Sequence, residues 1–376
     1  MKRVLFIGHE ASRTGAPIVL LHLLRGVRDA GEWQADVLLL AGGEMEAEYK
    51  SLARVYRSTA SASGLRRKLT RLAGGVPLPV VGEDVPQGYD VVVGNTIVSL
   101  GHLAAFKQRG CRTILWLHEL EDTIAQYYRA DDLRVLLRSV DHVICASRAV
   151  EAVVRRYAPQ AATTVIYEFA PTPEVDAVRA RGTVLAELGW DNNAFIVGGC
   201  GVVSERKGTD ILTDAAVKVL ERDANVRFLW IGGPAAGTED FARRQMERIE
   251  ESGIAERFVV TGRVEDPFRY LAALDVFALP SREDPFPLVC LEAAAFAKPI
   301  VCFADAGGIP EFVSLGAGTV LSDQSVDLLA ASITVYADDP QLARTHGSKA
   351  LELISTKFSP YEMISRFIET ISSAAG

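Results

Sequence analysis

Long hydrophobic runs are absent from this sequence of 376 residues. A membrane-spanning helix needs about 20 consecutive apolar residues. No run approaches that length, so the sequence predicts no transmembrane helix. The first apolar run ends at Gly8, before the polar residue His9. This run is too short for the core of a secretory signal. We therefore expect this run to be the first strand of the fold.

Cysteine is scarce and scattered. The chain has five cysteines, an odd number, with no Cys-x-x-Cys spacing and no cluster of Cys and His residues. A disulfide framework needs paired cysteines, and a structural zinc site needs clustered ligands. Neither is predicted, and the pattern fits a reducing cytoplasm best. The five positions are Cys111, Cys145, Cys200, Cys290 and Cys302.

An excess of positive charge is also missing. The formal net charge is −8, with 40 basic and 48 acidic residues. General binding to nucleic acid needs a broad positive surface, so we expect no nucleic-acid partner. The charge is uneven: residues 1–188 carry 23 basic and 21 acidic residues, whereas the remainder carries 17 and 27. A local basic face on the first half is compatible with this balance.

Two cofactor signatures are absent. Neither half of the chain opens with Gly-x-Gly-x-x-Gly, which disfavours a nicotinamide-dependent dehydrogenase. No Asp-x-Asp element is placed to hold a cation beside a diphosphate, so we expect no metal and no other cofactor.

What is present is the composition of a folded protein, with 49% hydrophobic and 23% charged residues. The length suffices for two domains with separate cores.

Short apolar runs recur between helix-length segments. Their apolar residues are continuous rather than alternating, which indicates strands buried on both faces of a parallel sheet. A break at residues 166–174, with two prolines, predicts a hinge. We therefore predict an α/β protein with two parallel sheets. The expected strands are 4–8, 35–41, 89–94, 113–117 and 142–146, then 194–203, 228–233, 258–262, 276–280 and 299–303.

The most informative run lies at residues 282–299 and reads R-E-D-P-F-P-L-V-C-L-E-A-A-A-F-A-K-P. Its prolines disfavour a helix before Pro287 and favour one that begins just after it. Asp284 then lies in a loop and Glu292 inside the helix. The free N–H groups of Leu288 and Val289 would form an anion site at the helix start. Taken alone, the run also fits a surface loop followed by a buried helix.

Four further stretches accompany this run. They are H-E-A-S-R-T-G-A-P at 9–17, W-L-H-E at 116–119, S-E-R-K-G at 204–208 and A-G-G-I-P-E at 306–311. Together, in kind and order, they resemble the retaining glycosyltransferases of the GT-B fold, specifically the family numbered four. The run at 282–299 is similar to the Glu-x7-Glu element of that family. The resemblance covers nearly the whole chain.

The resemblance implies two Rossmann-like domains facing across a cleft. It places an acceptor-side domain at residues 1–188 and a domain that binds the nucleotide sugar at 189–358. It also implies that the last helix, within 359–376, packs back on the first domain. The apolar stripe of that segment agrees with a packed helix.

Roles for individual residues follow from the resemblance. Asp284 matches the carboxylate that holds hydroxyls of the transferred sugar, and Glu292 the one that accepts both ribose hydroxyls. His118 matches a histidine that faces the donor sugar, positions a hydroxyl and helps to stabilise developing positive charge. The other donor-binding candidates are Gly15, Arg206, Lys207, Val264, Phe286, Leu288 and Val289, and the candidate acceptor residues are Asn95 and Thr96.

Two positions depart from the family pattern. Asp284 stands where the first Glu is usual, and Val202 stands where many members have an Arg. Arg206 and Lys207, at the start of a helix, therefore remain as the visible cations for a diphosphate. A solvated helix start is the alternative interpretation of this pair.

The expected function is transfer of a hexose-type sugar from a UDP- or GDP-sugar to a hydroxyl of a glycan or lipid-linked acceptor, with retention and without metal. Two other functions remain open at this stage. One is a nucleotide-sugar epimerase of the same fold, and the other is a non-catalytic subunit that binds sugar nucleotides.

A basic segment at residues 63–76 reads S-G-L-R-R-K-L-T-R-L-A-G-G-V. Its leucines share one helical face and its cations surround them, a pattern that can lie on an anionic membrane surface. A helix packed on the core with solvated arginines is the alternative. We expect a cytoplasmic protein, with peripheral contact at the inner face of the membrane through this segment as a further hypothesis.

Overall fold

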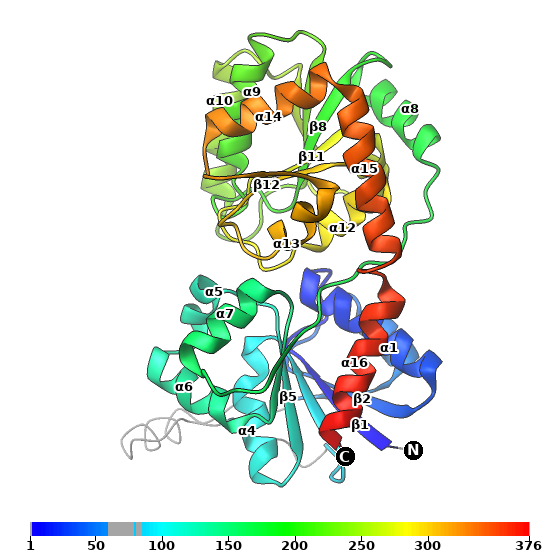
Figure 1. The fold of residues 1–376 in the computed structure, drawn as a ribbon, viewed down its shortest axis with the longest axis vertical. Helices are drawn as coiled ribbons and strands as arrows, with labels where there is room; N and C mark the ends of the chain where they lie inside the picture. Colours follow the sequence, from blue (N-terminus) through cyan, green and yellow to red (C-terminus); the bar gives the residue numbers. More distant parts are fainter. Residues whose placement is uncertain (1, 59–78, 80–84, 376) are drawn as a thin grey trace. The chain divides into compact units, whose positions relative to one another are not determined.

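The computed structural model describes residues 2–58, 79 and 85–375. The basic segment at 63–76 lies outside these residues. The chain divides into two compact units, Met1–Phe169 with Pro360–Gly376, and Ala170–Ser359 (Figure 1). Each unit is a parallel sheet covered by helices, the architecture expected for GT-B proteins.

The first unit contains a seven-stranded sheet in the order β3-β2-β1-β4-β5-β6-β7. Every neighbouring pair is parallel. Its strands are β1 (Lys2–Gly8), β2 (Trp33–Leu39), β3 (Arg54–Arg57), β4 (Val91–Asn95), β5 (Arg112–Leu117), β6 (His142–Cys145) and β7 (Thr163–Val165). Its helices are α1 (Gly15–Ala30), α2 (Glu46–Leu52), η1 (Ile97–Ser99), α4 (Leu100–Gln108), α5 (Glu121–Tyr127), α6 (Ala130–Ser139), α7 (Arg148–Tyr157) and α16 (Pro360–Ala375).

The second unit contains a six-stranded parallel sheet in the order β10-β9-β8-β11-β12-β13. Its strands are β8 (Phe195–Cys200), β9 (Val226–Ile231), β10 (Phe258–Val260), β11 (Val276–Leu279), β12 (Ile300–Phe303) and β13 (Gly318–Leu321). Its helices are α8 (Ala177–Leu188), α9 (Thr209–Leu220), α10 (Glu239–Glu251), α11 (Phe268–Ala273), α12 (Leu288–Ala295), α13 (Pro310–Phe312), η2 (Val313–Ala317), α14 (Val326–Asp338) and α15 (Pro340–Ser355).

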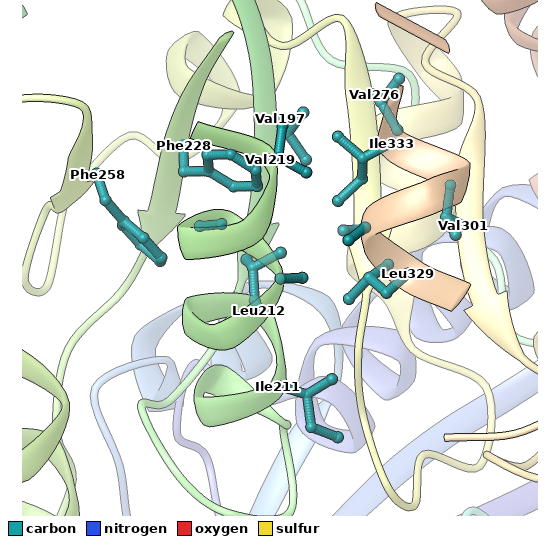
Figure 2. Close-up of a cluster of buried hydrophobic side chains, with 14 of the residues drawn as sticks. Val197, Ile211, Leu212, Val219, Phe228, Phe258, Val276, Val301, Leu329 and Ile333 are labelled. Atoms are coloured by element: carbon teal, nitrogen blue, oxygen red, sulfur yellow. The ribbon is translucent and has the colours of Figure 1, made fainter. Parts of the chain in front are cut away.

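The core of the second unit lies between the sheet and the helices α9 and α14 (Figure 2). Phe228 and Phe258, from neighbouring strands, stack with ring centroids 5.8 Å apart. Leu212 of α9 and Ile333 of α14 are fully buried in the same cluster. These apolar contacts hold the strand ends in place, and the loops that leave those ends carry the polar residues of interest.

The C-terminal helix α16 belongs to the first unit, where it lies beside α1 (Figure 1). Its apolar stripe is the contact surface: Phe367 packs on Trp116 with ring centroids 4.8 Å apart and on Phe6 at 6.4 Å. Gly26 of α1 makes room for Ile364, because a Cβ on that glycine would lie 2.6 Å from the isoleucine side chain.

The division between the units falls at 169/170 rather than at 188/189. Helix α8, which the sequence analysis assigned to the first domain, packs on α11 of the second unit. The guanidinium of Arg181 donates to the carbonyl oxygens of Ala273 and Ala194, and Glu187 pairs with Arg269 at 2.7 Å. The chain therefore changes units inside the proline-containing segment that was predicted as a hinge. In the part of the chain that the structure describes, none of the helices combines the length and apolarity required to span a bilayer.

Candidate active site

Three loops meet at the carboxyl edge of the second sheet, where ligands of parallel sheets usually bind. They follow the neighbouring strands β8, β11 and β12. The N–H of Arg282 donates to the carbonyl of Arg206 at 2.8 Å, and the N–H of Asp284 donates to the carbonyl of Ala306 at 2.6 Å. These two backbone bonds join residues 204–208, 281–284 and 306–308 into one edge.

The side chain of Arg282 connects this edge to helix α9. Its guanidinium makes two bonds to the carboxylate of Asp210, at 2.9 and 2.7 Å, and a third to the carbonyl of Glu205 at 2.5 Å. A bidentate arginine–carboxylate pair fixes orientation as well as distance. Arg282 therefore positions the loop that carries Arg206 and Lys207.

Lys207 and Asp284 form the central pair of the edge. The Lys207 Nζ atom donates to Oδ2 of Asp284 at 2.5 Å, and both side chains are largely buried. Arg206 lies 3.9 Å from the same oxygen and also donates to the carbonyl of Glu283 at 2.8 Å. Ser281 adds a 3.4 Å bond from its hydroxyl. The predicted phosphate-binding cation and the predicted sugar-binding carboxylate are thus direct partners.

Gly208 makes the close approach of these loops sterically feasible. It adopts φ +68, and a Cβ at this position would lie 1.9 Å from the carbonyl oxygen of Pro280. A side chain would therefore push the loop of Lys207 away from the loop of Asp284.

We predict that Gly208→Ala lowers the free energy of unfolding by about 2 kcal/mol or more, since it adds both backbone strain and a clash with backbone. Gly237 is the matched control, because it also has positive φ, at 86, but nothing lies within 4 Å of its Cβ position. Gly237→Ala should cost about 1 kcal/mol, from strain alone. Urea unfolding of the two variants measures both values, and equal losses would contradict a steric role for Gly208.

Helix α12 begins at the same edge. Pro287 precedes it in an extended conformation and no side chain caps its first turn. The N–H groups of Leu288 and Val289 are in that turn, where donors and the helix dipole favour an anion. Phe286 is buried, with its ring stacked on Phe358 at 6.1 Å, so it anchors the turn before the helix.

Glu292 lies on the second turn of α12 and is partly buried. Burial raises its pKa to about 7. It lies close enough to Cys200 that burial and the Glu292 charge together raise the pKa of that thiol to about 12. No hydrogen bond or ion pair joins the Glu292 side chain to any other residue that the structure describes. A carboxylate with such a desolvated position and no protein partner is suited to accept hydroxyl groups of a ligand.

A second group of polar residues lies at the carboxyl edge of the first sheet. His118 follows β5 and is buried; Nδ1 is 2.5 Å from Oε1 of Glu168, and Nε2 is 2.6 Å from Oδ1 of Asn95. The Asn95 amide nitrogen donates to the carbonyl of Ala16 at 3.0 Å. Asn95 is fully buried, so the structure places this predicted acceptor residue against His118, and its role toward an acceptor stays a prediction.

Thr96 next to it has an unusual backbone. Its φ is +88, which a β-branched residue rarely adopts. It is buried, and its hydroxyl has no hydrogen-bond partner among the described residues. Strain of this kind concentrates at functional sites. Near it, the Glu119 carboxylate accepts from the N–H groups of Ile97 and His118 at 3.1 Å.

The remaining predicted residues occupy loops or helix starts. Gly15 is the first residue of α1, and nothing lies within 4 Å of its Cβ position. Val264 lies in the loop after β10 and is half-buried. Arg206, Lys207, Asp284, Glu292, Leu288 and Val289 thus share one edge of the second unit, whereas Gly15, His118, Asn95 and Thr96 belong to the first unit. Over residues 2–58, 79 and 85–375, no three His, Cys, Asp or Glu side chains converge as metal ligands.

The sequence analysis did not identify Arg282 as the residue that ties its loop to Asp210, nor Glu168 as the hydrogen-bond partner of His118. Glu168 is 50 positions from His118, and Asp210 is 72 positions from Arg282. Local spacing carries no sign of such distant pairs. The only available signal is a charged residue inside an apolar stretch, as Glu168 is in 165–170.

Two family models match the chain. The model described as Glycosyltransferase Family 4 matches residues 13–172, and the model described as Glycosyl transferases group 1 matches residues 193–339. The two matches fall on the first unit and on the second unit, respectively, apart from the linker at the boundary.

Curated relatives and solved structures agree with these matches. The chain is 30% identical to the lipopolysaccharide core biosynthesis mannosyltransferase LpcC of Rhizobium leguminosarum over 165 residues, 44% of this chain and 47% of that protein. It is 29% identical to alpha-galactosylglucosyldiacylglycerol synthase of Streptococcus pneumoniae over 260 residues, 64% of this chain and 67% of that protein. The match to the first of these spans about half of that relative's length.

Among solved structures, HepE of Anabaena in complex with UDP-glucose superposes with a TM-score of 0.79 over 99% of this chain and 100% of that one, at 24% identity. Sucrose-phosphate synthase of Thermosynechococcus elongatus superposes with a TM-score of 0.77, at 20% identity, over 99% of each chain. At such identities the likeness shows the fold.

Proposed function

We propose, from the premise that this chain belongs to the GT-B glycosyltransferases of family 4, that it transfers a hexose-type sugar from a UDP- or GDP-sugar to a hydroxyl of a glycan or lipid-linked acceptor, with retention of configuration. The observation that carries the proposal is the composition of one edge of the second unit. Lys207, Asp284, the open first turn of α12 and the unpartnered Glu292 are combined there.

Each part of the edge suits one part of a nucleotide sugar. The N–H groups of Leu288 and Val289, with Lys207 and Arg206, supply donors and positive charge for a diphosphate. Glu292 supplies acceptor oxygens for the two ribose hydroxyls, and Asp284 accepts from hydroxyls of the sugar. Lys207 would then bridge sugar-binding and phosphate-binding groups, because its amine has three donors and uses one on Asp284.

The reaction proposed is a displacement on one face of the sugar. The bond from the anomeric carbon to the phosphate oxygen breaks, the bond to the acceptor oxygen forms, and the acceptor proton passes to the departing phosphate. Negative charge grows on the diphosphate as it leaves. The protein's contribution is to hold fixed donors and cations where that charge develops. These groups take the place of a metal ion in the proposal.

Names of similar proteins support the substrate class without fixing it. HepE was crystallised with UDP-glucose, LpcC is a mannosyltransferase of lipopolysaccharide core biosynthesis, and the Streptococcus protein makes a glycolipid. A nucleotide-sugar donor and a glycan or lipid-linked acceptor fit all three.

A thermal-shift panel of UDP, GDP and ADP and their sugars tests donor binding. We expect one of the uridine or guanosine series, at about a hundred times its Kd, to raise Tm by on the order of 5 °C, because a ligand that binds only the folded state stabilises it. The shift should be equal with and without EDTA. Absence of a shift with every nucleotide would contradict the proposal.

Products then distinguish transfer from its alternatives. NMR of the donor incubated alone detects conversion by an epimerase, and NMR of a glycoside formed on an added acceptor reports its anomeric configuration. Retention requires that the product has the configuration of the donor.

A further inference from the structure

The hydrogen bonds around His118 determine which ring nitrogens carry protons. Asn95 donates through Nδ2 to the carbonyl of Ala16, which can only accept, so its Oδ1 faces His118. The other ring nitrogen faces a carboxylate oxygen of Glu168. Both ring nitrogens therefore face oxygen atoms. Nε2 must carry a proton to bond Asn95, and an ionised Glu168 requires a proton on Nδ1 as well. With Glu168 ionised, the imidazole is a cation.

The surroundings of Glu168 and His118 agree with this charge state. Glu168 is 6% exposed, and its Oε2 atom has no hydrogen-bond partner among the residues that the structure describes. A buried carboxylate with one partner is stable as an anion only if that partner is positively charged. The ring of Trp116 lies 4.5 Å from the ring of His118, and an aromatic face also favours a cation.

Burial and the neighbouring charges shift the pKa of His118 in opposite directions. Burial lowers the pKa of His118, but the charge and hydrogen bond of Glu168, with a smaller effect of Glu119, raise it above its usual value. His9, from the loop after β1, is close enough for the charge of His118 to act on it, and the pKa of His9 is lowered by burial despite Glu10 beside it. His9 is therefore mainly neutral and competes little for the positive charge.

We propose that Glu168 is a positioning residue for sugar transfer, because it holds His118 as a cation whose two N–H groups are both engaged within the protein. This inference rests on the proposed function. His118 then presents a fixed positive charge at the carboxyl edge of the first sheet. A cation does not stabilise developing positive charge, so this part of the expectation for His118 is not favoured by the arrangement.

A pH dependence follows. Because the folded-state pKa is raised, the cation is present below that pKa and is lost as pH rises through it. Activity should therefore fall on the alkaline side as His118 loses its proton. Removing the Glu168 charge should move that fall to lower pH.

The experiment combines NMR with kinetics. In protein labelled with ¹⁵N-histidine, the His118 ring is assigned as the signal that His118→Asn removes. Both ring nitrogens should be protonated at pH 7, and Glu168→Gln should lower the midpoint by about one pH unit or more, since one unit corresponds to about 1.4 kcal/mol. The alkaline limb of kcat should move by the same amount, with kcat lowered about tenfold at pH values above both midpoints and the donor KM changed much less.

Glu168→Asp is the conservative variant and should recover most of both effects, which also covers the case in which Glu168→Gln folds poorly. A neutral His118 ring at pH 7 in the wild type, or an unchanged midpoint in Glu168→Gln, would overturn the assignment of charge. A shifted midpoint with an unshifted kcat profile would overturn the role in transfer. If the wild type transfers no sugar while the midpoint shifts as expected, the proposed function fails and the charge state stands.

Discussion

Replacement of Lys207 by alanine should lower kcat/KM for the nucleotide sugar by about a hundredfold or more, the scale for losing one preorganised electrostatic contact. Lys207 lies 2.5 Å from Oδ2 of Asp284, closer than Arg206, which lies 3.9 Å from the same atom. Its loss removes a donor for the diphosphate and leaves the buried Asp284 carboxylate without its closest partner. Steady-state kinetics with the best donor of the thermal-shift panel measure the effect.

Stability should fall in the same variant, because breaking one side of a buried ion pair costs about 3–5 kcal/mol. Lys218 provides the matched control: it pairs with Asp327 at 2.7 Å in the same unit, but both side chains are solvent-exposed. Lys218→Ala should change neither kinetics nor stability by more than a small amount. A Lys207→Ala enzyme with wild-type turnover would remove Lys207 from the donor site.

Replacement of Glu292 by glutamine should affect function and stability in opposite directions. A carboxylate has two oxygens that accept hydrogen bonds from the two ribose hydroxyls, whereas the neutral amide has one. We therefore expect kcat/KM to fall by about a hundredfold or more. The pKa of Glu292 is raised to about 7 from an ordinary value of 4.5. A raised carboxyl pKa means that the folded state holds its proton more tightly, so the wild type loses stability as pH rises from 4.5 through 7.

Glutamine removes this pH-dependent loss. The gain in the free energy of unfolding should be small at pH 5 and on the order of 3 kcal/mol at pH 8, from about 1.4 kcal/mol per pKa unit. Urea unfolding at the two pH values measures the difference. Glu352, exposed on α15 beside Lys349, is the control position, and Glu352→Gln should show neither effect. Equal stability of Glu292→Gln and wild type at pH 8 would show that Glu292 is less desolvated than its position indicates.

Continuous apolar runs predicted most of the fold, because strands buried on both faces leave that pattern. All ten expected strands are present. The strands that sequence reasoning did not name are β3, β7 and β13, which lie at sheet edges and span three or four residues each. Edge strands are covered on fewer sides, so their sequences need not be uniformly apolar. Residues 163–165 read T-T-V and are all half-buried.

The candidate site was predictable where a motif is local and not where it depends on distant contacts. The start of α12 follows from two prolines and is found at Leu288 as expected. The contact between Lys207 and Asp284 joins residues 77 positions apart, so each was assigned a separate role and their pairing was missed. Asn95 was named as a candidate acceptor residue, and the structure places its buried side chain against His118. Strand ends indicate an edge and not the direction of a side chain.

The backbone bonds that join the three loops of the second unit bear on how such proteins diversify. Asp284 pairs with Ala306 on one side and, through its carbonyl, with the N–H of Gly308 on the other, while Arg282 is tied to Arg206. A chimera that exchanges only residues 282–292 with a relative would keep these backbone bonds, but its new side chains at 282 and 284 would still face Asp210 and Lys207 of the original chain. We therefore expect a chimera to retain both side-chain pairs only when segments 204–210 and 281–292 are exchanged together.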